Sequence, residues 1–217
     1  MSDPHAPTSG RIEPRRRVDR AARLLIWNNV LERTVIMKRL LAFGLGCLGL
    51  ASPLYAALKP GDAAPDFTTQ ATLAGVPFKF ALSEALKSGP VVLYFYPAAF
   101  SHGCTVEAHE FAEATDKFKS LGATVIGVSH DSIDTLNKFS VSDCRSKFAV
   151  ASDEDLKITK EYDARLFYIT SYSDRTSYVI APTGKIIYAY TALNPDKHVE
   201  NTMAAVAKWR TDQKSGS

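Results

Sequence analysis

A cysteine lies at the start of an expected helix, in the segment that runs from Pro97 to Cys104 after an apolar strand-like run. Ser101 and Gly103 precede Cys104, and Glu107 follows it by three residues. A thiol on the first turn of a helix faces unpaired backbone N–H groups and the positive end of the helix dipole, which stabilise its thiolate. Because the thiolate is the nucleophilic form of cysteine, the sequence predicts a reactive Cys104.

The polar residues near Cys104 favour the transfer of oxygen to its sulfur. Ionisation of the thiol alone accelerates such a reaction only about thirtyfold, so other groups must stabilise the transferring oxygen. Ser101 offers a hydroxyl, and the backbone amides of Gly103 and Cys104 form an anion site. Pro97 presents no N–H and helps to shield the sulfur from water.

These residues resemble the Pro-x-x-x-Thr/Ser-x-x-Cys signature of the peroxiredoxins, the AhpC/TSA-like family, and are closest to the bacterioferritin comigratory protein or Q-type subgroup. The likeness covers Leu58 to about Arg210. It implies a thioredoxin-like fold and a thiol-dependent peroxidase, without a cofactor or metal. The matching residues elsewhere are Thr105, Glu107, Pro60-Gly61, Ala64-Pro65-Asp66-Phe67, Ser129, Asp131 and Arg175.

The resemblance implies that Cys104 is the peroxidatic cysteine, which attacks hydrogen peroxide or an organic hydroperoxide and becomes a sulfenic acid. A thioredoxin-like or other thiol donor would then reduce the enzyme. The resemblance also implies that Arg175 lies in the site, where its fixed donors could reach both the thiolate and a peroxide oxygen. Glu107 would order the site by holding Arg175 or a backbone group, or would be a solvated helix carboxylate. Arg175 could instead form a surface salt bridge with Asp174. A buried structural role for Cys104 is disfavoured by its place on a strand-to-helix turn.

The resolving cysteine is where the chain departs from the subgroup. Many members carry a second cysteine five residues after the first, and His109 occupies that position here. We expect Cys144, near the end of a later helix, to attack the sulfenic acid of Cys104. This requires local unwinding, because a disulfide tolerates at most about 7 Å between Cα atoms. The alternative is that Cys144 belongs to the core and the enzyme uses one cysteine.

A second interpretation is a thioredoxin-like copper-handling or redox-binding protein without peroxidase activity. His102, Cys104 and His109 lie close together in the sequence and could bind a metal. Copper sites of this kind generally use a second nearby cysteine, which is absent here. The lack of a Cys-x-x-Cys pair also disfavours a disulfide oxidoreductase. We therefore predict no metal site and no cofactor.

The elements that position these residues follow an α/β order, which indicates a thioredoxin-like fold with a mixed central sheet flanked by helices. The domain is expected to span residues 58–210, followed by a flexible tail over residues 211–217. Capping patterns place one helix after Asp131 and another after Ser152. The other expected elements are an early hairpin over residues 67–82, strands over 91–96 and 124–128, a helix over 104–121, a hairpin of 177–180 with 185–190, and a last helix from Asn194.

The 217 residues are 46% hydrophobic and 23% charged, which fits one globular domain and excludes a fibrous or multi-span membrane protein. The formal net charge is +3. Residues 1–39 carry a net charge of +5, which leaves −2 for the rest of the chain. The part of the chain after residue 39 is thus slightly acidic, which disfavours binding to nucleic acid.

Residues 37–57 have the pattern of a secretory signal peptide. Lys38 and Arg39 precede the apolar run Leu40–Leu50, which is shorter than the about 20 residues of a membrane-spanning helix. Cleavage after Ala56 would release a periplasmic protein that does not bind membranes, as a monomer or homodimer. An uncleaved signal would instead anchor it to the membrane.

The stretch before the signal and the signal itself allow three interpretations. We expect Met37 to be the true start, so that residues 1–36 are a non-native or disordered extension. Residues 21–35 could instead form a basic amphipathic helix on a membrane surface. A lipoprotein signal acylated at Cys47 fits poorly, because Gly44 lies where that signal normally has leucine.

Overall fold

The computed structural model describes residues 57–215. The expected signal peptide and N-terminal extension, with Cys47, lie outside these residues and stay predictions. No helix within the described residues is long and apolar enough to cross a membrane.

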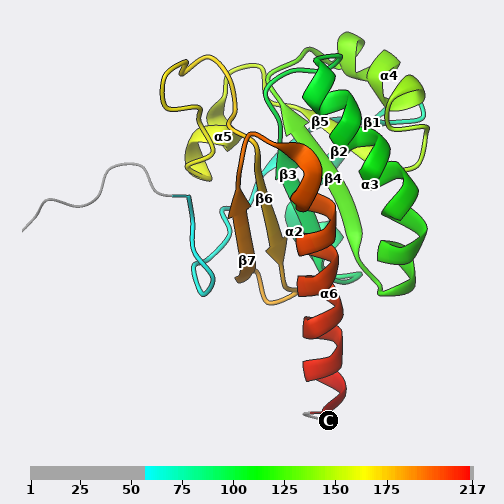
Figure 1. Ribbon diagram of the computed structural model, residues 1–217, viewed down its shortest axis with the longest axis vertical. Helices are drawn as coiled ribbons and strands as arrows, with labels where there is room; N and C mark the ends of the chain where they lie inside the picture. Colours follow the sequence, from blue (N-terminus) through cyan, green and yellow to red (C-terminus); the bar gives the residue numbers. More distant parts are fainter. Residues whose placement is uncertain (1–56, 216–217) are drawn as a thin grey trace, which may run out of the picture. The chain divides into compact units, whose positions relative to one another are not determined.

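A seven-stranded mixed sheet forms the centre of the domain, in the strand order β2-β1-β5-β4-β3-β6-β7 (Figure 1). β4 pairs in parallel with both β3 and β5, and the other pairs are antiparallel. This mixed topology confirms the predicted fold class. The strands are β1 (Thr68–Leu73), β2 (Val76–Ala81), β3 (Val91–Phe95), β4 (Thr124–Ser129), β5 (Ala149–Ser152), β6 (Thr176–Ile180) and β7 (Ile186–Thr191).

Helices cover both faces of the sheet because successive side chains of a buried strand point to opposite sides. Val92 and Tyr94 of β3 pack in one hydrophobic core with α3, α4 and α6. Val91, Leu93 and Phe95 pack in the other core, with α2 and α5. The helices are α2 (Leu82–Leu86), α3 (His102–Ser120), α4 (Ile133–Ser142), α5 (Lys157–Glu161) and α6 (His198–Ser215), with a 3-10 turn η1 (Pro195–Lys197).

The pairing of β3 with β6 determines where the functional residues meet. The two strands are antiparallel, with Phe95 opposite Thr176. The last residue of β3 therefore lies beside the first residue of β6. The chain runs from β3 through a short loop into α3, so the residue just before β6 lies at the same end of the sheet as the start of α3.

Two short elements of the structure, α2 and β5, were not predicted from the sequence. α2 follows β2 directly, and β5 joins the sheet between β1 and β4. The sequence of β5 is only Ala-Val-Ala-Ser, which is too short for a clear alternating pattern, and alanine is depleted in strands. The alternating pattern that indicates a strand is therefore missing.

Both predicted helix caps are wrong. Ser132 caps α4 in place of Asp131, and its Oγ accepts a hydrogen bond from Thr135 N at 3.4 Å. Ser152 does not cap α5, because its Oγ donates to the carbonyl oxygen of Asp131 at 2.7 Å. The N-cap residue of α5 is Leu156, which makes no side-chain cap. Asp153, three residues earlier, accepts from the backbone N–H groups of Ile158 and Thr159 at 3.0 Å and 2.8 Å.

The last helix begins where it was predicted and ends later. Asn194 accepts from Asp196 N at 3.2 Å and opens η1, which leads into α6. α6 continues to Ser215, so residues 211–215 are helical rather than part of a separate tail. The ion pair between Lys208 and Asp212 at 2.7 Å joins successive turns of this extension.

Candidate active site

Cys104 is the third residue of α3, which begins at His102 after the N-cap residue Ser101. Its side chain is 1% exposed. The first hydrogen bond of the helix runs from Thr105 N to the carbonyl oxygen of Ser101, at 2.9 Å. The N–H groups of the preceding residues have no acceptor within the helix, and the positive end of the helix dipole adds to them. The start of the helix therefore favours a negatively charged sulfur on Cys104.

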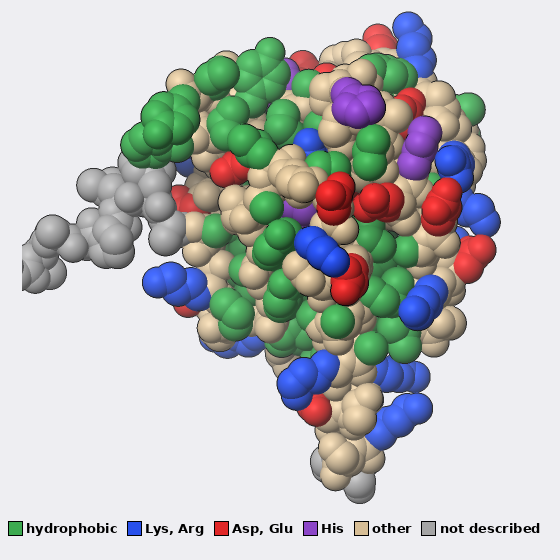
Figure 2. Space-filling model, in the orientation of Figure 1, with side chains coloured by type: hydrophobic (Ala, Val, Ile, Leu, Met, Phe, Trp, Pro, Cys, Tyr) green, Lys and Arg blue, Asp and Glu red, His purple; other side chains and the backbone are tan. Residues whose placement is uncertain are grey.

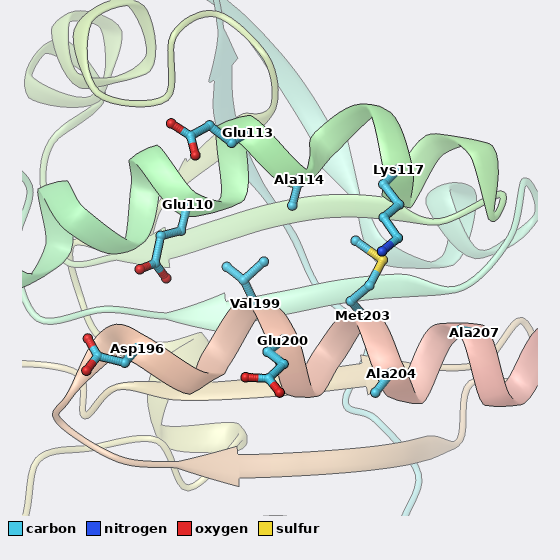
Figure 3. Close-up of a pocket in the computed structure, with 10 residues that line it drawn as sticks. All are labelled: Glu110, Glu113, Ala114, Lys117, Asp196, Val199, Glu200, Met203, Ala204 and Ala207. Atoms are coloured by element: carbon cyan, nitrogen blue, oxygen red, sulfur yellow. The ribbon is translucent and has the colours of Figure 1, made fainter.

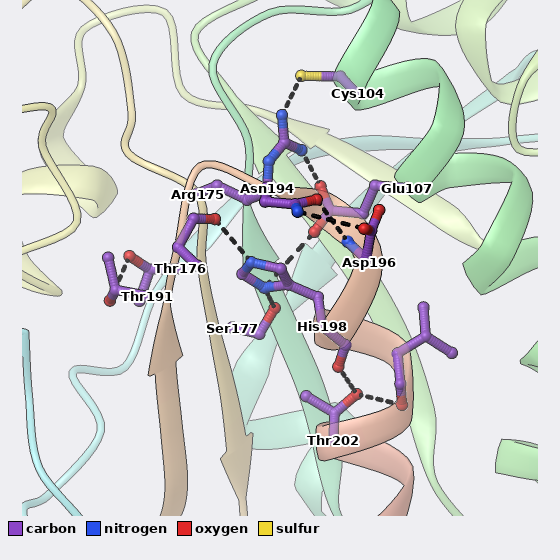
Figure 4. A network of polar contacts seen from close by, with 12 residues as sticks. Cys104, Glu107, Arg175, Thr176, Ser177, Thr191, Asn194, Asp196, His198 and Thr202 are labelled. Atoms are coloured by element: carbon purple, nitrogen blue, oxygen red, sulfur yellow. Dashed lines mark hydrogen bonds and ion pairs between the residues drawn. The ribbon is translucent and has the colours of Figure 1, made fainter.

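Arg175 lies just before β6, and each of the three nitrogens of its guanidinium has a hydrogen-bond acceptor. Figure 4 shows the guanidinium between Cys104 and Glu107. Nη2 donates to Cys104 Sγ at 3.4 Å, Nη1 donates to Glu107 Oε2, and Nε donates to the carbonyl oxygen of Leu193 at 2.9 Å. The residue is 4% exposed. Its side chain therefore points into the protein, and no surface pair with Asp174 forms. The Asp174 carboxylate accepts from the backbone N–H of Arg175 at 2.7 Å.

Glu107 is one turn further along α3 and is fully buried, so the interpretation as a solvated helix carboxylate is wrong. One carboxylate oxygen binds Arg175, and the other lies 3.6 Å from Nδ1 of His198. Two elements distant in sequence, β6 and α6, thus meet α3 around one carboxylate. Cys104, Arg175, Glu107 and His198 form a continuous buried chain of polar contacts.

His198, the first residue of α6, was not predicted as part of the site. It is fully buried, with Nδ1 2.8 Å from Ser177 Oγ and Nε2 2.8 Å from the carbonyl oxygen of Ala192. A weak signal exists in the sequence, because His198 and Thr202 are four residues apart, next to the apolar face predicted for the last helix. Two polar residues beside an inner face indicate a buried polar network rather than packing alone.

Burial governs the protonation of this network. It raises the pKa of Glu107 to about 8, although the charge of Arg175 acts in the opposite direction. Burial lowers the pKa of His198 to about 4. For Arg175, burial alone would lower the pKa, but the charges of Glu107 and Cys104 outweigh it and the net shift is upward. The guanidinium therefore keeps its charge beside the sulfur.

The loop before α3 is held by Asp131. The carboxylate accepts from Ala99 N and from Ser129 Oγ, each at 2.7 Å. This contact explains why Asp131 does not cap α4. Phe100 has a positive φ of 63°, a strained conformation for a bulky residue that the surrounding loop must hold in place.

The structure places the other predicted residues of this segment at different depths. Ser101 is exposed, and its Oγ donates to the carbonyl oxygen of Ala98 at 2.9 Å rather than to Cys104. Pro97 is half-buried. Gly103 packs against the guanidinium of Arg175, and a Cβ atom at this position would lie 3.1 Å from Nη2.

Cys144 is fully buried and lies two residues beyond the end of α4, in the same core cluster as Cys104. Burial, and the neighbouring charge of Asp143, raise the pKa of its thiol. Both cysteines are unpaired. Their chain neighbours are in direct contact, because Thr105 Oγ1 donates to Asp143 Oδ1 at 2.6 Å.

An exposed apolar loop lies between α5 and β6, at the same end of the sheet (Figure 2). Phe167, Tyr168 and Ile169 are 69%, 88% and 51% exposed. Tyr172, further along the loop, packs against His130 with ring centroids 4.7 Å apart. His130 follows the end of β4. The loop therefore adds an apolar surface beside the residues that position Cys104.

A separate groove runs between α3 and α6 (Figure 3). Its floor includes Val199 and Met203, and four carboxylates lie along it together with Lys117. No predicted site residue lines this groove. The carboxylates belong to Glu110, Glu113, Asp196 and Glu200.

Residues 57–215 contain no group of three His, Cys, Asp or Glu side chains that could hold a metal ion. His102 is exposed and His109 is half-buried, and the two do not form such a group with Cys104. The copper-handling interpretation therefore has no three-ligand set in this part of the chain.

Comparisons with known proteins agree with this geometry. The sequence model of the AhpC/TSA family matches residues 60–189. The chloroplastic peroxiredoxin Q of Populus jackii is 33% identical over 151 residues, which cover 69% of this chain and 68% of that protein. The crystal structure of peroxidoxin BcpB from Mycobacterium tuberculosis has a TM-score of 0.62 and 28% identity, and covers 70% of this chain and 97% of that one.

A mutant of PrxQ from Xylella fastidiosa shares the fold, with a TM-score of 0.62 and 24% identity over 70% of this chain and 98% of that one. The buried cysteine at the start of α3 thus occurs in a fold and a sequence that both match thiol peroxidases. The chain belongs to the AhpC/TSA family and is a Q-type peroxiredoxin, a thiol-dependent peroxidase.

Proposed function

We propose that Cys104 is the peroxidatic cysteine of this chain, and that it reduces hydrogen peroxide and organic hydroperoxides. The observation that carries the proposal is the 3.4 Å contact between Arg175 Nη2 and Cys104 Sγ at the start of α3. A fixed guanidinium donates to this sulfur, and the positive end of the helix dipole lies at the same turn, so both favour the thiolate form. The apolar side chains of Phe167 and Ile169 support organic hydroperoxides as substrates.

In the first step the thiolate attacks the terminal oxygen of the hydroperoxide. An S–O bond forms as the O–O bond breaks, so the sulfur is oxidised to a sulfenic acid and the peroxide is reduced. The leaving hydroxide or alkoxide takes up a proton and becomes water or an alcohol. Arg175 stabilises the charge that develops on the oxygens. Ser101, at the exposed entrance, supplies a hydroxyl that can turn from Ala98 to the peroxide, and Pro97 shields the sulfur from water.

In the second step the thiol of Cys144 attacks the sulfur of the Cys104 sulfenic acid. A disulfide forms and water leaves. The contact of Thr105 with Asp143 supports this pairing, because it joins the immediate neighbours of the two cysteines. Both thiols are buried, so α3 and the segment after α4 must open locally before the bond can form.

A dithiol donor of the thioredoxin type would then reduce the disulfide through a mixed disulfide and become oxidised itself. We place the enzyme in the periplasm, on the signal pattern of residues 37–56, which would require a reductant outside the cytoplasm. Intact-mass measurement of the protein from its native host tests this placement. A product that begins after Ala56 is expected, and one that retains Arg15 would contradict it.

Rapid-mixing peroxide consumption by four variants tests the proposed residues together. Cys104→Ser is expected to abolish the reaction, and Arg175→Ala to slow it by about a hundredfold or more. Cys144→Ser should leave the first oxidation fast and prevent the disulfide, which non-reducing peptide mapping detects. Arg145→Ala is the matched control, because this exposed arginine forms an ion pair with Glu113 on the surface. Peroxide consumption by Cys104→Ser at the wild-type rate would overturn the proposal.

A further inference from the structure

We propose that Asp131 is a positioning residue of the peroxidase site, which holds the start of α3 from outside the helix and leaves the first backbone N–H groups of α3 free to act at Cys104. This inference rests on the proposed function of Cys104. Asp131 lies two residues beyond the end of β4 and acts through the backbone of Ala99.

The start of α3 has no side-chain cap. Its N-cap residue is Ser101, and a capping hydroxyl there would accept from the N–H of the second or third helical residue, Gly103 or Cys104. The Ser101 hydroxyl donates instead to the carbonyl oxygen of Ala98 at 2.9 Å. The N–H groups of Gly103 and Cys104 are therefore left for a thiolate or a peroxide oxygen, and the helix start has to be held by a group outside α3.

The residues that lead into α3 form a tight turn. Ser101 N lies 3.4 Å from the carbonyl oxygen of Ala98, and Phe100, the third residue of the turn, has a φ of 63°. A positive φ at this position is the pattern of a type II turn, which favours glycine there. Because the conformation is strained for a bulky side chain, the turn keeps it only where neighbouring groups hold it.

Two contacts from the part of the chain after β4 hold this turn. One carboxylate oxygen of Asp131 accepts from Ala99 N at 2.7 Å. The Phe100 ring packs edge-on against Phe139 of α4, with centroids 5.2 Å apart. The hydrogen bond of the turn itself uses the N–H of Ser101, so the N–H of Ala99 is available to the carboxylate, which binds it more strongly than a neutral acceptor would.

Asp131 is itself fixed to the central sheet. The oxygen that binds Ala99 also accepts from Ser129 Oγ at 2.7 Å, and the backbone carbonyl oxygen of Asp131 accepts from Ser152 Oγ at 2.7 Å. The two serines are the last residues of β4 and β5, which pair in parallel. Asp131 therefore ties the entry of α3 to two central strands, a support of the kind that keeps reacting groups in place.

The first test is Asp131→Ala in the full chain. NMR-detected hydrogen exchange should show the N–H of Ala99 exchanging at least about tenfold faster than in the wild type. The pH midpoint of Cys104 alkylation by iodoacetamide should rise by about half a unit, because a frayed helix start stabilises the thiolate less. The rate with hydrogen peroxide should fall about tenfold.

Three further variants separate positioning from a general loss of stability. Phe100→Gly added to Asp131→Ala should return the midpoint and the rate toward the wild-type values, because glycine adopts the positive φ without strain. Asp131→Asn keeps an oxygen that can accept from Ala99 N, so its effects should be smaller. Ser132→Ala is the matched control, because it removes the cap of α4 at the next residue and does not touch the turn. It should leave the midpoint unchanged.

Unchanged exchange at Ala99 or an unchanged midpoint in Asp131→Ala would overturn the inference. A shift that Phe100→Gly does not reverse, or one of equal size in Ser132→Ala, would also overturn it. Because exchange and alkylation need no peroxide, failure of the proposed function is a separate result. In that case both measurements would behave as expected while peroxide left Cys104 unoxidised.

Discussion

Thr105 Oγ1 donates a 2.6 Å hydrogen bond to Asp143 Oδ1, and each residue is the immediate neighbour of a cysteine. The bond joins the first turn of α3, which carries Cys104, to the end of α4, beside Cys144. Ser142 Oγ binds the other carboxylate oxygen of Asp143 at 2.5 Å. The same contact therefore holds the two cysteine segments together and opposes the opening that disulfide formation requires.

Thr105→Val is expected to speed formation of the Cys104–Cys144 disulfide. A hydrogen bond to a charged group stabilises by about 1.5–3 kcal/mol, so its loss should raise the population of the open state by about ten- to a hundredfold. Rapid quenching after peroxide addition, with non-reducing peptide mapping, measures the rate. Thr115→Val is the matched control, because it removes a buried bond within α3 alone. A rate equal to or below that of the wild type would contradict the expectation.

Arg175→Lys is expected to lower the second-order rate with hydrogen peroxide by about a hundredfold, although the positive charge remains. Lysine cannot reproduce the fork that binds Cys104, Glu107 and Leu193 at once. Stopped-flow kinetics measures the rate. Arg145→Lys, on the surface, should change it little. If Arg175→Lys kept the wild-type rate, charge alone would explain the role of Arg175.

Gly103→Ala separates activity from stability. The new Cβ would lie 3.1 Å from Arg175 Nη2 and would press the guanidinium away from the sulfur. Alanine is the better helix former by about 0.5–1 kcal/mol, so folding should suffer little. We expect about a tenfold loss of peroxidase rate. The thermal melting temperature should change little. A fully active variant would show that the guanidinium can shift without consequence.

The stability of the folded state should depend on pH through Glu107. Its pKa is raised by burial to about 8 from the ordinary 4.5, so the folded protein holds a proton that the unfolded chain releases. Stability is therefore lost as pH rises from about 4.5 toward 8. His198 has a pKa lowered to about 4 from 6.5 and acts in the opposite sense, so stability is lost as pH falls through that range.

Urea denaturation at several pH values measures this dependence. In Glu107→Gln the decline toward pH 8 should be smaller than in the wild type, since the carboxyl group is absent. The decline at low pH, which His198 causes, should remain. Parallel curves for the two proteins between about pH 4.5 and pH 8 would contradict the assignment of the raised pKa to Glu107.

The apolar run of β3 and the turn into α3 predicted both the fold class and the position of Cys104, because local patterns determine them. The meeting of Arg175 with Cys104 follows from the pairing of Phe95 with Thr176, which links distant parts of the chain. Local patterns do not contain that information, and here the resemblance to a family supplied it. His198 was not predicted, because its only signal in the sequence is the weak one of two polar residues, His198 and Thr202, beside the apolar face of the last helix.

The predicted helix caps were also wrong because local patterns do not reveal tertiary contacts. Asp131 and Ser152 both lie where a capping residue is expected, and tertiary contacts use their side chains instead. Asp131 holds the backbone of Ala99 in the loop before Cys104, which a local rule for helix starts cannot foresee. Glu107 likewise had two equal interpretations, and burial beside Arg175 decides between them.

Trapping of the sulfenic acid after one equivalent of hydrogen peroxide tests the central claim most directly. The Cys144→Ser protein, mixed with peroxide and then with dimedone, is digested and mapped by mass spectrometry. If Cys104 is the peroxidatic cysteine, the label appears on Cys104 within seconds and is absent from Cys104→Ser. A free Cys104 thiol after the peroxide has been consumed, or a label on a different residue, would contradict it.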